Sequence, residues 1–559
     1  MPELDGNGRR SSGDDDLEGR VSALLSELTI DEKLSLCAGA SYWNTKAVSR
    51  LGIAKMKVTD GPRGVSFQSG YRRCTAFPSG IAQAATWDEE LLVRFGEAAA
   101  EEAKSVGAKV LLGPAINITR TPLNGRTFEY LSEDPLLNSR LTVSIVEGIQ
   151  SRGVAACVKH FAANNQEKDR ARIDARVSRR ALEEIYLPAF RAAVEQADAW
   201  SVMAAYNAVN GEACCENHEL LSVKLREEYG FRGLVMSDWY AAKRTTSTER
   251  CVHAGLNLEM PGRGSKYKTK NLRESLDEGG FTEEELDTLV GDLLRVMLLT
   301  GHIDGDDDPG SRNTRAHQAL ARRLAEESIT LLKNENGLLP LDPGRSQKVA
   351  VIGPKADARN CFPLWGGSAG VWPPYEVTPS AGMRGRAASS RLDMVDSVEQ
   401  ADVVLVVVGL SHRPRFDSEG FDRESLDLPG EQNQLIEDTV ATNPRTVVVL
   451  INGSPVAMPW ADRVPAILEC WYPGMEGGNA IARIVCGDVN PSGKLPVTFP
   501  RRLEDSPAHR SAETYPGDGE TVHYEEDIFV GYRHFDHAGL EPLFPFGHGL
   551  SYTEFEYDG

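Results

Sequence analysis

No stretch of this sequence is apolar enough to cross a membrane, because the longest hydrophobic run extends only from Val403 to Leu410. The first residues, MPELDGNGRRSSGDDDLEGR, lack the apolar core of a secretory signal peptide. Basic residues are in deficit, with 61 Lys and Arg against 82 Asp and Glu, and the formal charge of −21 repels nucleic acids and anionic membranes. We therefore expect a neutral or cationic small molecule as the partner, and neither nucleic acid nor membrane.

The nine cysteines form no CxxC pair and show no metal-ligand spacing, so no metal site is expected. Cys214 and Cys215 are adjacent, which is a poor geometry for a disulfide. We expect reduced thiols that pack as small hydrophobes in a cytoplasmic protein. The turn GPKADARN follows an apolar segment but lacks the glycine-rich dinucleotide fingerprint, and no cofactor is predicted.

Short apolar segments alternate with amphipathic helices over residues 17–300, and this alternation predicts a parallel sheet. The fold class is therefore α/β, with a (β/α)8-like TIM barrel as the expected closure. Six segments are found where a complete barrel has eight strands, so an incomplete barrel stays open as an alternative. The polar residues 1–16 are expected to be disordered. The expected strands are residues 55–64, 108–118, 154–165, 199–207, 233–239 and 255–262.

A segment rich in Asp and Gly, residues 301–314, is the expected linker to a second domain over residues 315–559. The second domain begins with a predicted helix, HQALARRLAEESITLLKN, and EQNQLIEDTVATN is a predicted crossover helix. Runs of Val, Ile and Leu predict the central parallel strands of a doubly wound α/β sandwich. Those runs are KVAVIGP, ADVVLVVVGL, TVVVLING and AILECWYPG.

The stretch FRGLVMSDWYAA places a carboxylate, Asp238, at the end of a predicted buried strand. Side chains at the carboxyl ends of barrel strands face the active site, and a carboxylate there is either paired or functional. Trp239 follows directly, and an indole is a surface on which the apolar face of a sugar packs. A strand-end Asp that only caps the next helix is the alternative.

Polar residues also end the other predicted strands of the first domain. Each of them alone has an ordinary explanation as a turn, a solvated charge or a core residue. Together they are expected to surround Asp238, to hydrogen-bond hydroxyl groups and, through their two cations, to keep that carboxylate ionised. These residues are Asp60, Arg126, Lys159, His160 and Tyr206.

Seven motifs give the chain a resemblance to glycoside hydrolase family 3, the β-glucosidase type, from about residue 20 to residue 559. The resemblance implies a retaining mechanism in which Asp238 is the nucleophile and Glu419 is the general acid/base. The motifs, in order, are DGPRG, GRTFEYLSEDP, KHFAANNQ, MAAYN, VMSDW, SEGFDRESLDLPGEQ and FPFGHGLSYTEFEY.

The same resemblance implies which residues hold the terminal sugar, with Tyr206 beside the nucleophile and Trp239 as an aromatic wall. The C-terminal tail is expected to complete the site. Three acidic residues near Glu419 in the sequence are expected to raise its pKa, as an acid role requires. The residues that match the family's hydroxyl-binding positions are Asp60, Arg126, Lys159 and His160.

Asp60 favours glucose, because xylosidase-like members of the family carry a longer Glu where the exocyclic group is absent. We therefore expect an exo-acting β-glucosidase for terminal non-reducing β-D-glucosyl residues. β-Xylosidase or α-L-arabinofuranosidase activity, and an inactive sugar-binding relative, stay open as alternatives. The sequence stops at FEYDG, where many relatives continue into a fibronectin-type domain. We expect the edge left uncovered to serve homo-oligomer contacts.

Overall fold

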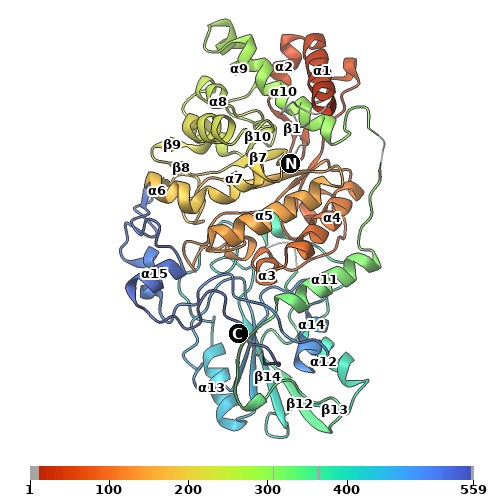
Figure 1. The fold of residues 1–559 in the computed structure, drawn as a ribbon, viewed down its shortest axis with the longest axis vertical. Helices are drawn as coiled ribbons and strands as arrows, with labels where there is room; N and C mark the ends of the chain where they lie inside the picture. Colours follow the sequence, from red (N-terminus) through yellow and green to blue (C-terminus); the bar gives the residue numbers. More distant parts are fainter. Residues whose placement is uncertain (1–11, 306–307, 362–365, 555–559) are drawn as a thin grey trace, which may run out of the picture.

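The computed structural model describes residues 12–305, 308–361 and 366–554 (Figure 1). The chain forms two parts, one up to the end of α10 at Leu299 and one from the start of α11 at Arg315. A five-stranded parallel sheet in the order β10-β7-β5-β4-β3 forms the centre of the first part. Every residue of these strands is buried, as expected for apolar strands covered on both faces. The strands are β3 (Val58–Asp60), β4 (Val110–Leu112), β5 (Ala155–Phe161), β7 (Ser201–Ala204) and β10 (Leu234–Ser237).

This sheet is a curled half-barrel, so the prediction of a parallel α/β sheet is confirmed, in the incomplete form of the barrel that the six expected strands had left open. The sixth expected strand, residues 255–262, makes only isolated bridges, from Leu258 to Met236 and from Glu259 to Ala38. A strand cannot continue there because Pro261 lacks an N–H donor and Gly262 has a positive φ of 82°.

Helices cover the half-barrel, and Figure 1 shows α4, α5 and α7 lying across one face of it. Helices α4 and α5 pack against each other through the close approach of Gly96 to the backbone of Ile145 and Gly148. The helices of this part are α1 (Ser12–Glu27), α2 (Ile30–Leu36), α3 (Gly80–Ala85), α4 (Glu89–Ser105), α5 (Pro135–Gln150), α6 (Arg179–Ala181), α7 (Pro188–Glu195), α8 (Thr248–Ala254), α9 (Thr269–Asp277) and α10 (Glu283–Leu299). A small antiparallel pair joins β1 (Gly39–Ser41) to β2 (Asn44–Thr45).

Helix α1 begins at Ser12, so the expectation of disorder up to residue 16 is wrong for residues 12–16. Acidic residues near a helix N-terminus, such as Asp15 and Asp16, stabilise the first turn. Glu18 anchors the helix to the body of the protein, because its carboxylate accepts hydrogen bonds from Arg232 and, at 2.7 and 2.9 Å, from Arg295. Residues 1–11 lie outside the described part of the chain.

The second part contains a six-stranded sheet in the order β11-β16-β15-β14-β12-β13. All neighbours are parallel except β11, which runs antiparallel to β16. The strands are β11 (Thr330–Asn334), β12 (Gln347–Ile352), β13 (Leu392–Val395), β14 (Val403–Gly409), β15 (Thr446–Ile451) and β16 (Ala466–Glu469). Helices α11 (Arg315–Ser328), α12 (Pro379–Ala387), α13 (Gln432–Thr442) and α14 (Gly477–Val485) accompany this sheet.

Two expectations for this part need correction. The predicted helix through ITLLKN ends at Ser328, and Thr330–Asn334 form β11, since β-branched residues favour a strand once β16 offers a pairing edge. The short strand β13 was not expected at all, because LDMV carries no long apolar run. The predicted crossover helix is α13, and the predicted linker spans the gap between α10 and α11, with residues 306–307 outside the description.

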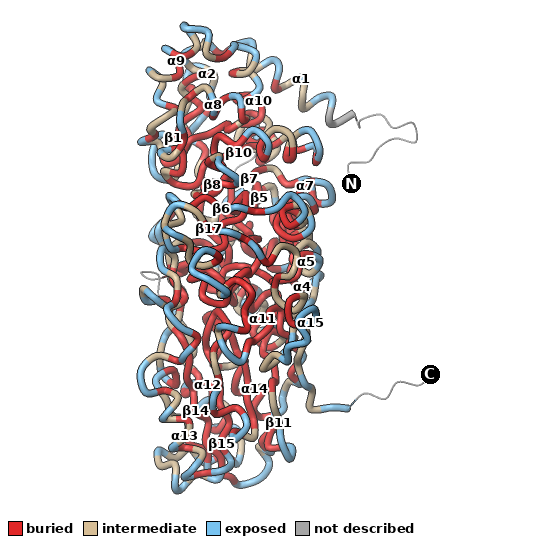
Figure 2. The backbone as a smooth tube through the Cα atoms, turned by 90° about the vertical axis from the view of Figure 1, so that its left-hand side faces the viewer, coloured by how far each residue is buried: buried red, intermediate tan, exposed pale blue. Residues whose placement is uncertain are grey.

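The C-terminal segment returns to the first part, where β17 (Thr521–His523) pairs in parallel with β6 (Asp174–Arg176). They belong to a four-stranded sheet with β8 (Ala208–Val209) and β9 (Glu212–Ala213), and α15 (Tyr532–Ala538) follows. Figure 2 shows buried backbone along the full height of the molecule, through both parts. Phe128 of the first part lies in the hydrophobic core of the second, so the two parts share a packed interface.

None of the helices in the described ranges combines the length and the apolarity needed to span a membrane. All nine cysteines are buried and free, including the neighbours Cys214 and Cys215.

Candidate active site

A cavity of about 220 Å³ lies where the strand ends of the half-barrel meet loops of the second part. Strand β3 ends at Asp60, β5 carries Lys159 and His160 near its end, and Asp238 follows the last residue of β10. Polar residues at these positions meet because parallel strands place their carboxyl ends at one edge of the sheet. All eight residues predicted from the sequence line this cavity: Asp60, Arg126, Lys159, His160, Tyr206, Asp238, Trp239 and Glu419.

Asp238 is buried, with 7% of its surface exposed. Its Oδ1 accepts a hydrogen bond from the Trp239 backbone N–H at 2.6 Å, and its Oδ2 lies 3.7 Å from His160 Nε2. Burial raises the pKa of Asp238, while Arg170 and Arg126 act to lower it. The cations therefore favour the ionised form as the sequence predicted, but desolvation outweighs them.

Asp60 belongs to a chain of alternating charges across the floor of the cavity. Lys159 Nζ lies 3.5 Å from Asp60 Oδ1 and 3.6 Å from Glu129 Oε1, and Glu129 accepts two hydrogen bonds from Arg126 at 2.8 and 2.9 Å. Burial raises the pKa of Asp60 to about 7, against the opposing attraction of Lys159. Lys159 is thus paired with Asp60 of β3 and with Glu129 in the segment after β4, and Arg126 is paired with Glu129.

Arg126 and His160 each present a polar group to the cavity that is available to hydrogen-bond a ligand. Arg126 Nη1 is buried and has no hydrogen-bond partner among the described residues, so it is a donor available to a ligand hydroxyl. Burial and the nearby Arg126 hold the pKa of His160 well below its usual value, so the imidazole is neutral at neutral pH. Asn117 orients this ring, since its Oδ1 accepts from the His160 backbone N–H at 2.8 Å and lies 3.2 Å from Nδ1.

Glu419 enters the cavity from the second part, on the loop between β14 and α13. Its Oε1 accepts from Arg170 Nη2 at 3.0 Å, and its Oε2 accepts from the Ser368 backbone N–H at 2.7 Å. Burial alone would raise the pKa of Glu419, but Arg126 and Arg170 outweigh it and hold this pKa well below its usual range.

The prediction that acidic neighbours raise the pKa of Glu419 is therefore wrong, because those neighbours have other partners. Asp417 accepts hydrogen bonds from Gly453 N, Ser454 Oγ and Tyr472 OH at 2.6–2.8 Å. Asp422 accepts from three backbone N–H groups of the first part, each at 2.9 Å. Both carboxylates thus fix the loop that carries Glu419, one to the second part and one to the first.

Sequence reasoning missed several residues of the cavity, above all Arg170. Its guanidinium bonds to Glu167 at 2.6 Å and to Glu419 at 3.0 Å, and it stacks 4.5 Å above the ring of Tyr206. Arg170 lies in the charged stretch EKDRAR, which is typical of a solvated loop, so no local signal distinguished it. The other lining residues that were not predicted include Tyr42, Trp43, Gln68, Gly367 and Ser368.

The aromatic wall and the C-terminal tail also differ from expectation. Trp239 is joined by Trp43, at 5.5 Å between ring centroids, and its Nε1 donates to the Tyr42 carbonyl at 3.0 Å. Among the described residues that line the cavity, none comes after Glu419. The tail instead lines a neighbouring cavity beside Tyr206, through residues 519–521.

Known protein families match both parts of the chain: the glycosyl hydrolase family 3 N terminal domain over residues 32–296, and the glycosyl hydrolase family 3 C-terminal domain over residues 329–552. The chain belongs to glycosyl hydrolase family 3. It is a glycoside hydrolase similar to β-glucosidases.

Named relatives of this family 3 chain include the thermostable beta-glucosidase B of Acetivibrio thermocellus, which is 41% identical over 96% of this chain and 73% of that protein. An exo-alpha-(1->6)-L-arabinopyranosidase of Bifidobacterium breve is 40% identical over the same shares. Among solved structures, beta-glucosidase 3B from Thermotoga neapolitana in complex with glucose superimposes with a TM-score of 0.87 and 35% identity, over 97% of this chain and 84% of that one.

Proposed function

We propose that this family 3 chain is a retaining, exo-acting β-glucosidase that releases terminal non-reducing β-D-glucosyl residues. The main support is that Asp238 and Glu419, which come from different parts of the molecule, line one cavity of about 220 Å³. Relatives named beta-glucosidase, and a solved relative in complex with glucose, support the choice of sugar.

In the proposed first step Asp238 attacks the anomeric carbon while Glu419 protonates the leaving oxygen. In the second step Glu419 takes a proton from the water that releases the sugar. Arg170 and the Ser368 N–H stabilise Glu419 as an anion, which is the form that the second step needs. Before the first step, the negative charge of Asp238 raises the pKa of Glu419, because two nearby carboxylates each raise the pKa of the other. Bond formation between Asp238 and the sugar removes the charge of Asp238, so Glu419 then ionises more readily.

Recognition of the sugar is proposed to rest on the charged floor of the cavity. Asp60 accepts from two hydroxyl groups, and Lys159, His160 and the free Arg126 Nη1 contact the others. Trp239 and Trp43 supply the apolar surface for the ring face. Each donor is already held by a carboxylate or amide, so the site needs little ordering when the sugar binds.

The identity of the nucleophile is tested with 2,4-dinitrophenyl 2-deoxy-2-fluoro-β-D-glucoside, whose slow turnover traps a glycosyl-enzyme. Mass spectrometry is expected to find the adduct on Asp238, and proton NMR to find β-glucose as the first product from an aryl glucoside. Asp238→Asn is expected to form no adduct, whereas Asp277→Asn, at an exposed helix end, is expected to label normally. An adduct on another residue, or α-glucose as the first product, contradicts the proposal.

A second candidate is α-L-arabinopyranosidase activity, which two relatives at 39–40% identity have in their names. An arabinopyranose lacks the exocyclic hydroxymethyl group, so it forgoes one of the hydrogen bonds proposed for Asp60. We expect a higher kcat/KM on 4-nitrophenyl β-D-glucoside than on the β-D-xyloside or the α-L-arabinopyranoside. A preference for either pentose would reverse the assignment of the substrate.

We also propose a cytoplasmic location. The support is that all nine cysteines are buried, free thiols, and disulfides are rare in the reducing cytoplasm. Fractionation of the source cells with an antibody to this chain tests the location, and recovery outside the cytoplasmic fraction would exclude it.

A further inference from the structure

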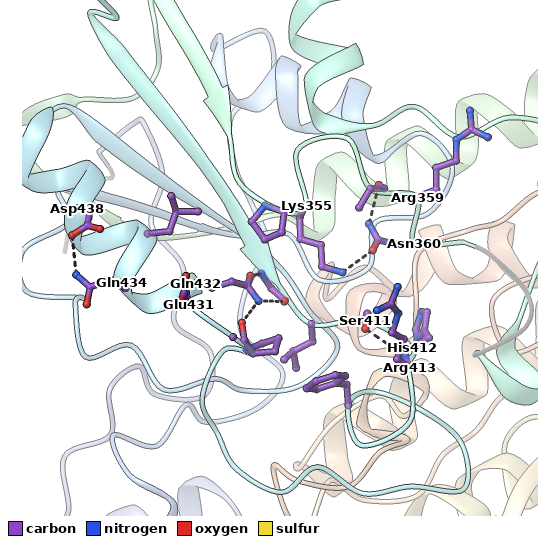
Figure 3. A pocket seen from close by; sticks show the side chains of 18 residues that line it. Lys355, Arg359, Asn360, Ser411, His412, Arg413, Glu431, Gln432, Gln434 and Asp438 are labelled. Carbon is purple, nitrogen blue, oxygen red and sulfur yellow. Dashed lines mark hydrogen bonds between the residues drawn. The ribbon is translucent and has the colours of Figure 1, made fainter. Parts of the chain in front are cut away.

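The second part of the molecule has a cavity of its own, of about 1170 Å³, far larger than the catalytic one (Figure 3). It lies at the carboxyl ends of β12 and β14, and residues from the start of α13 line its third side. The strand order reverses between these two strands, since β13 lies beyond β12 on one side and β15 and β16 lie beyond β14 on the other. Doubly wound sheets bind ligands at such a reversal point.

The floor of this cavity holds a buried cation, Lys355, whose surface is only 8% exposed. Its Nζ donates to Asn360 Oδ1 at 3.2 Å, as Figure 3 shows, and no ion pair with a carboxylate is found for it among the described residues. Buried charges in proteins are normally paired, because desolvation of an unpaired ion costs several kcal/mol. Lys355 therefore lacks the anionic partner that its position calls for.

The charges that face Lys355 from the surrounding elements do not supply this partner. Asp417 and Glu376 attract it and Arg413 repels it, but burial dominates and lowers its pKa to about 8. Asp417 is already held by three hydrogen bonds, and Glu376 accepts from the backbone N–H groups of Asn360 and Cys361. Three cations thus line the same space: Lys355 is buried, and Arg359 and Arg413 lie at the exposed rim.

His412 adds a second unused polar group to the lining. Its Nδ1 bonds to the Asp417 carbonyl at 2.8 Å, while its Nε2 is buried and has no partner among the described residues. Burial lowers the pKa of His412 well below its usual value, so the ring is neutral. Because Nδ1 must donate its proton to the carbonyl, Nε2 is left as an acceptor, and the group that pairs with it has to be a donor such as a hydroxyl.

Helix α13 strengthens the site for an anion. Gln432, its first residue, binds both the N–H and the carbonyl of Gly409, at 2.8 and 3.1 Å, and so holds the start of this 11-residue helix against the end of β14. No side chain caps this N-terminus, whose N–H groups favour negative charge. The acidic residues of the lining, Glu431 and Asp438, are exposed, so the buried charge of the cavity is positive.

We propose that this cavity binds a sugar-sized, hydroxylated organic anion, with the anionic group on Lys355 and Arg413 and a hydroxyl donating to His412 Nε2. A phosphate and a carboxylate both satisfy the cations, so a phosphorylated sugar and a sugar acid share the required chemistry. Inorganic phosphate supplies no hydroxyl group apart from its own anionic group, and an uncharged sugar supplies no anion for Lys355. The proposal is independent of the reaction at Asp238 and Glu419.

Isothermal titration calorimetry of the full chain at pH 7 tests it with glucose 6-phosphate, gluconate, inorganic phosphate and glucose. Saturable binding of glucose 6-phosphate or of gluconate is expected, and whichever binds identifies the anionic group. Lys355→Met is expected to weaken the binding of that anion at least tenfold, since a hydrogen bond to a charged group contributes about 1.5–3 kcal/mol. Lys348→Met, at an exposed lysine of β12, is the matched control and is expected to bind like the parent chain.

Asp60→Asn separates the two cavities. Binding in the larger cavity survives Asp60→Asn and is lost in Lys355→Met, whereas binding in the catalytic cavity shows the opposite pattern. The proposal is overturned if neither organic anion binds, if Lys355→Met binds like the parent chain, if binding is lost only in Asp60→Asn, or if inorganic phosphate binds as tightly as the organic anions.

Proton uptake gives a readout that belongs to Lys355. A bound anion favours its charged form, so binding at pH 8.5 is expected to take up protons, and affinity is expected to fall between pH 7 and pH 9. Titrations in two buffers of different ionisation enthalpy measure this uptake, which Lys355→Met should abolish. If Lys355→Met does not fold, Arg413→Gln at the exposed rim replaces it, with a several-fold loss of affinity expected and an unchanged affinity overturning the proposal.

Discussion

Replacing Arg170 with Gln removes one of the three cations that hold Glu419 as an anion. Arg170 Nη2 lies 3.0 Å from Glu419 Oε1, and both side chains are less than one-fifth exposed. Two unit charges about 4 Å apart interact by roughly 4 kcal/mol at an effective dielectric constant of about 20. One pKa unit corresponds to about 1.4 kcal/mol, so the pKa of Glu419 should rise by roughly 1–3 units in Arg170→Gln, with Arg126 still in place.

The assay is the pH dependence of kcat/KM on phenyl β-D-glucoside, whose poor leaving group needs a protonated Glu419. The alkaline limb of this profile reports the ionisation of the acid in the free enzyme. A raised pKa of Glu419 extends its protonated form to higher pH, so the alkaline limb should shift to higher pH by roughly 1–3 pH units, even though the maximum of kcat/KM falls. Glu167 loses its partner as well: burial already raises its pKa to about 7, and loss of Arg170 raises this pKa further, so the protonated form of Glu167 is favoured in the variant.

Arg172→Gln is the matched control, because Arg172 is 73% exposed and pairs with Asp169 outside the catalytic cavity. This variant should leave the limb where it is. An unchanged limb in a folded Arg170→Gln protein would refute the electrostatic account of Glu419. A downward shift would refute it as well.

Three further predictions concern the same cavity. Gly367→Ala would place a Cβ 2.3 Å from Glu419 Oε2 at a φ of +56°, so kcat/KM should fall by roughly 100-fold with a stability loss of only about 1 kcal/mol. Gly385→Ala in α12, with open space around it, should leave kcat/KM unchanged and stabilise the protein by about 0.5–1 kcal/mol. In Glu419→Ala, kcat/KM should fall 10²–10⁴-fold on phenyl β-D-glucoside but little on the 2,4-dinitrophenyl glucoside; equal losses of kcat/KM on both substrates count against an acid role. On the dinitrophenyl glucoside kcat should fall, because no base activates the water, and azide should restore it with β-glucosyl azide as the product. Asp60 has a folded pKa of about 7 against an ordinary value of 3.8, so its contribution to stability is lost as pH rises from 4 to 7. Asp60→Asn should therefore gain on the order of 2–4 kcal/mol over the parent chain at pH 8 relative to pH 5, and a Tm difference that is the same at both pH values would contradict this.

The sequence identified its site residues in two ways. Some lie at or just beyond the end of an apolar strand, and the others lie inside a motif with fixed spacing. Asp60 ends β3, Lys159 lies near the end of β5 and Asp238 directly follows β10. Parallel strands bring these ends together at one edge of the sheet. Glu419 was identified only through the family motif, because its loop has the composition of a solvated segment. All of them line the cavity.

Other features depended on pairing partners that the sequence does not reveal. The segment ITLLKN became β11 because β16 offered an edge, and residues 255–262 failed to become a strand because Pro261 and Gly262 interrupt the pairing. The strand β17 pairs with β6 across more than 300 residues of chain. Propensity over a few residues is too weak to decide such long-range pairing.

The sequence by itself determined the parallel α/β architecture, most of the central strands and the charged residues at their ends, because alternation and strand-end chemistry are local. Only the tertiary structure decided the direction of the pKa shifts at Asp238 and Glu419 and the role of Arg170, which reaches Glu419 across 249 positions. The physical reason is that desolvation and Coulomb attraction depend on depth and distance in space. A charge count along the chain contains neither quantity.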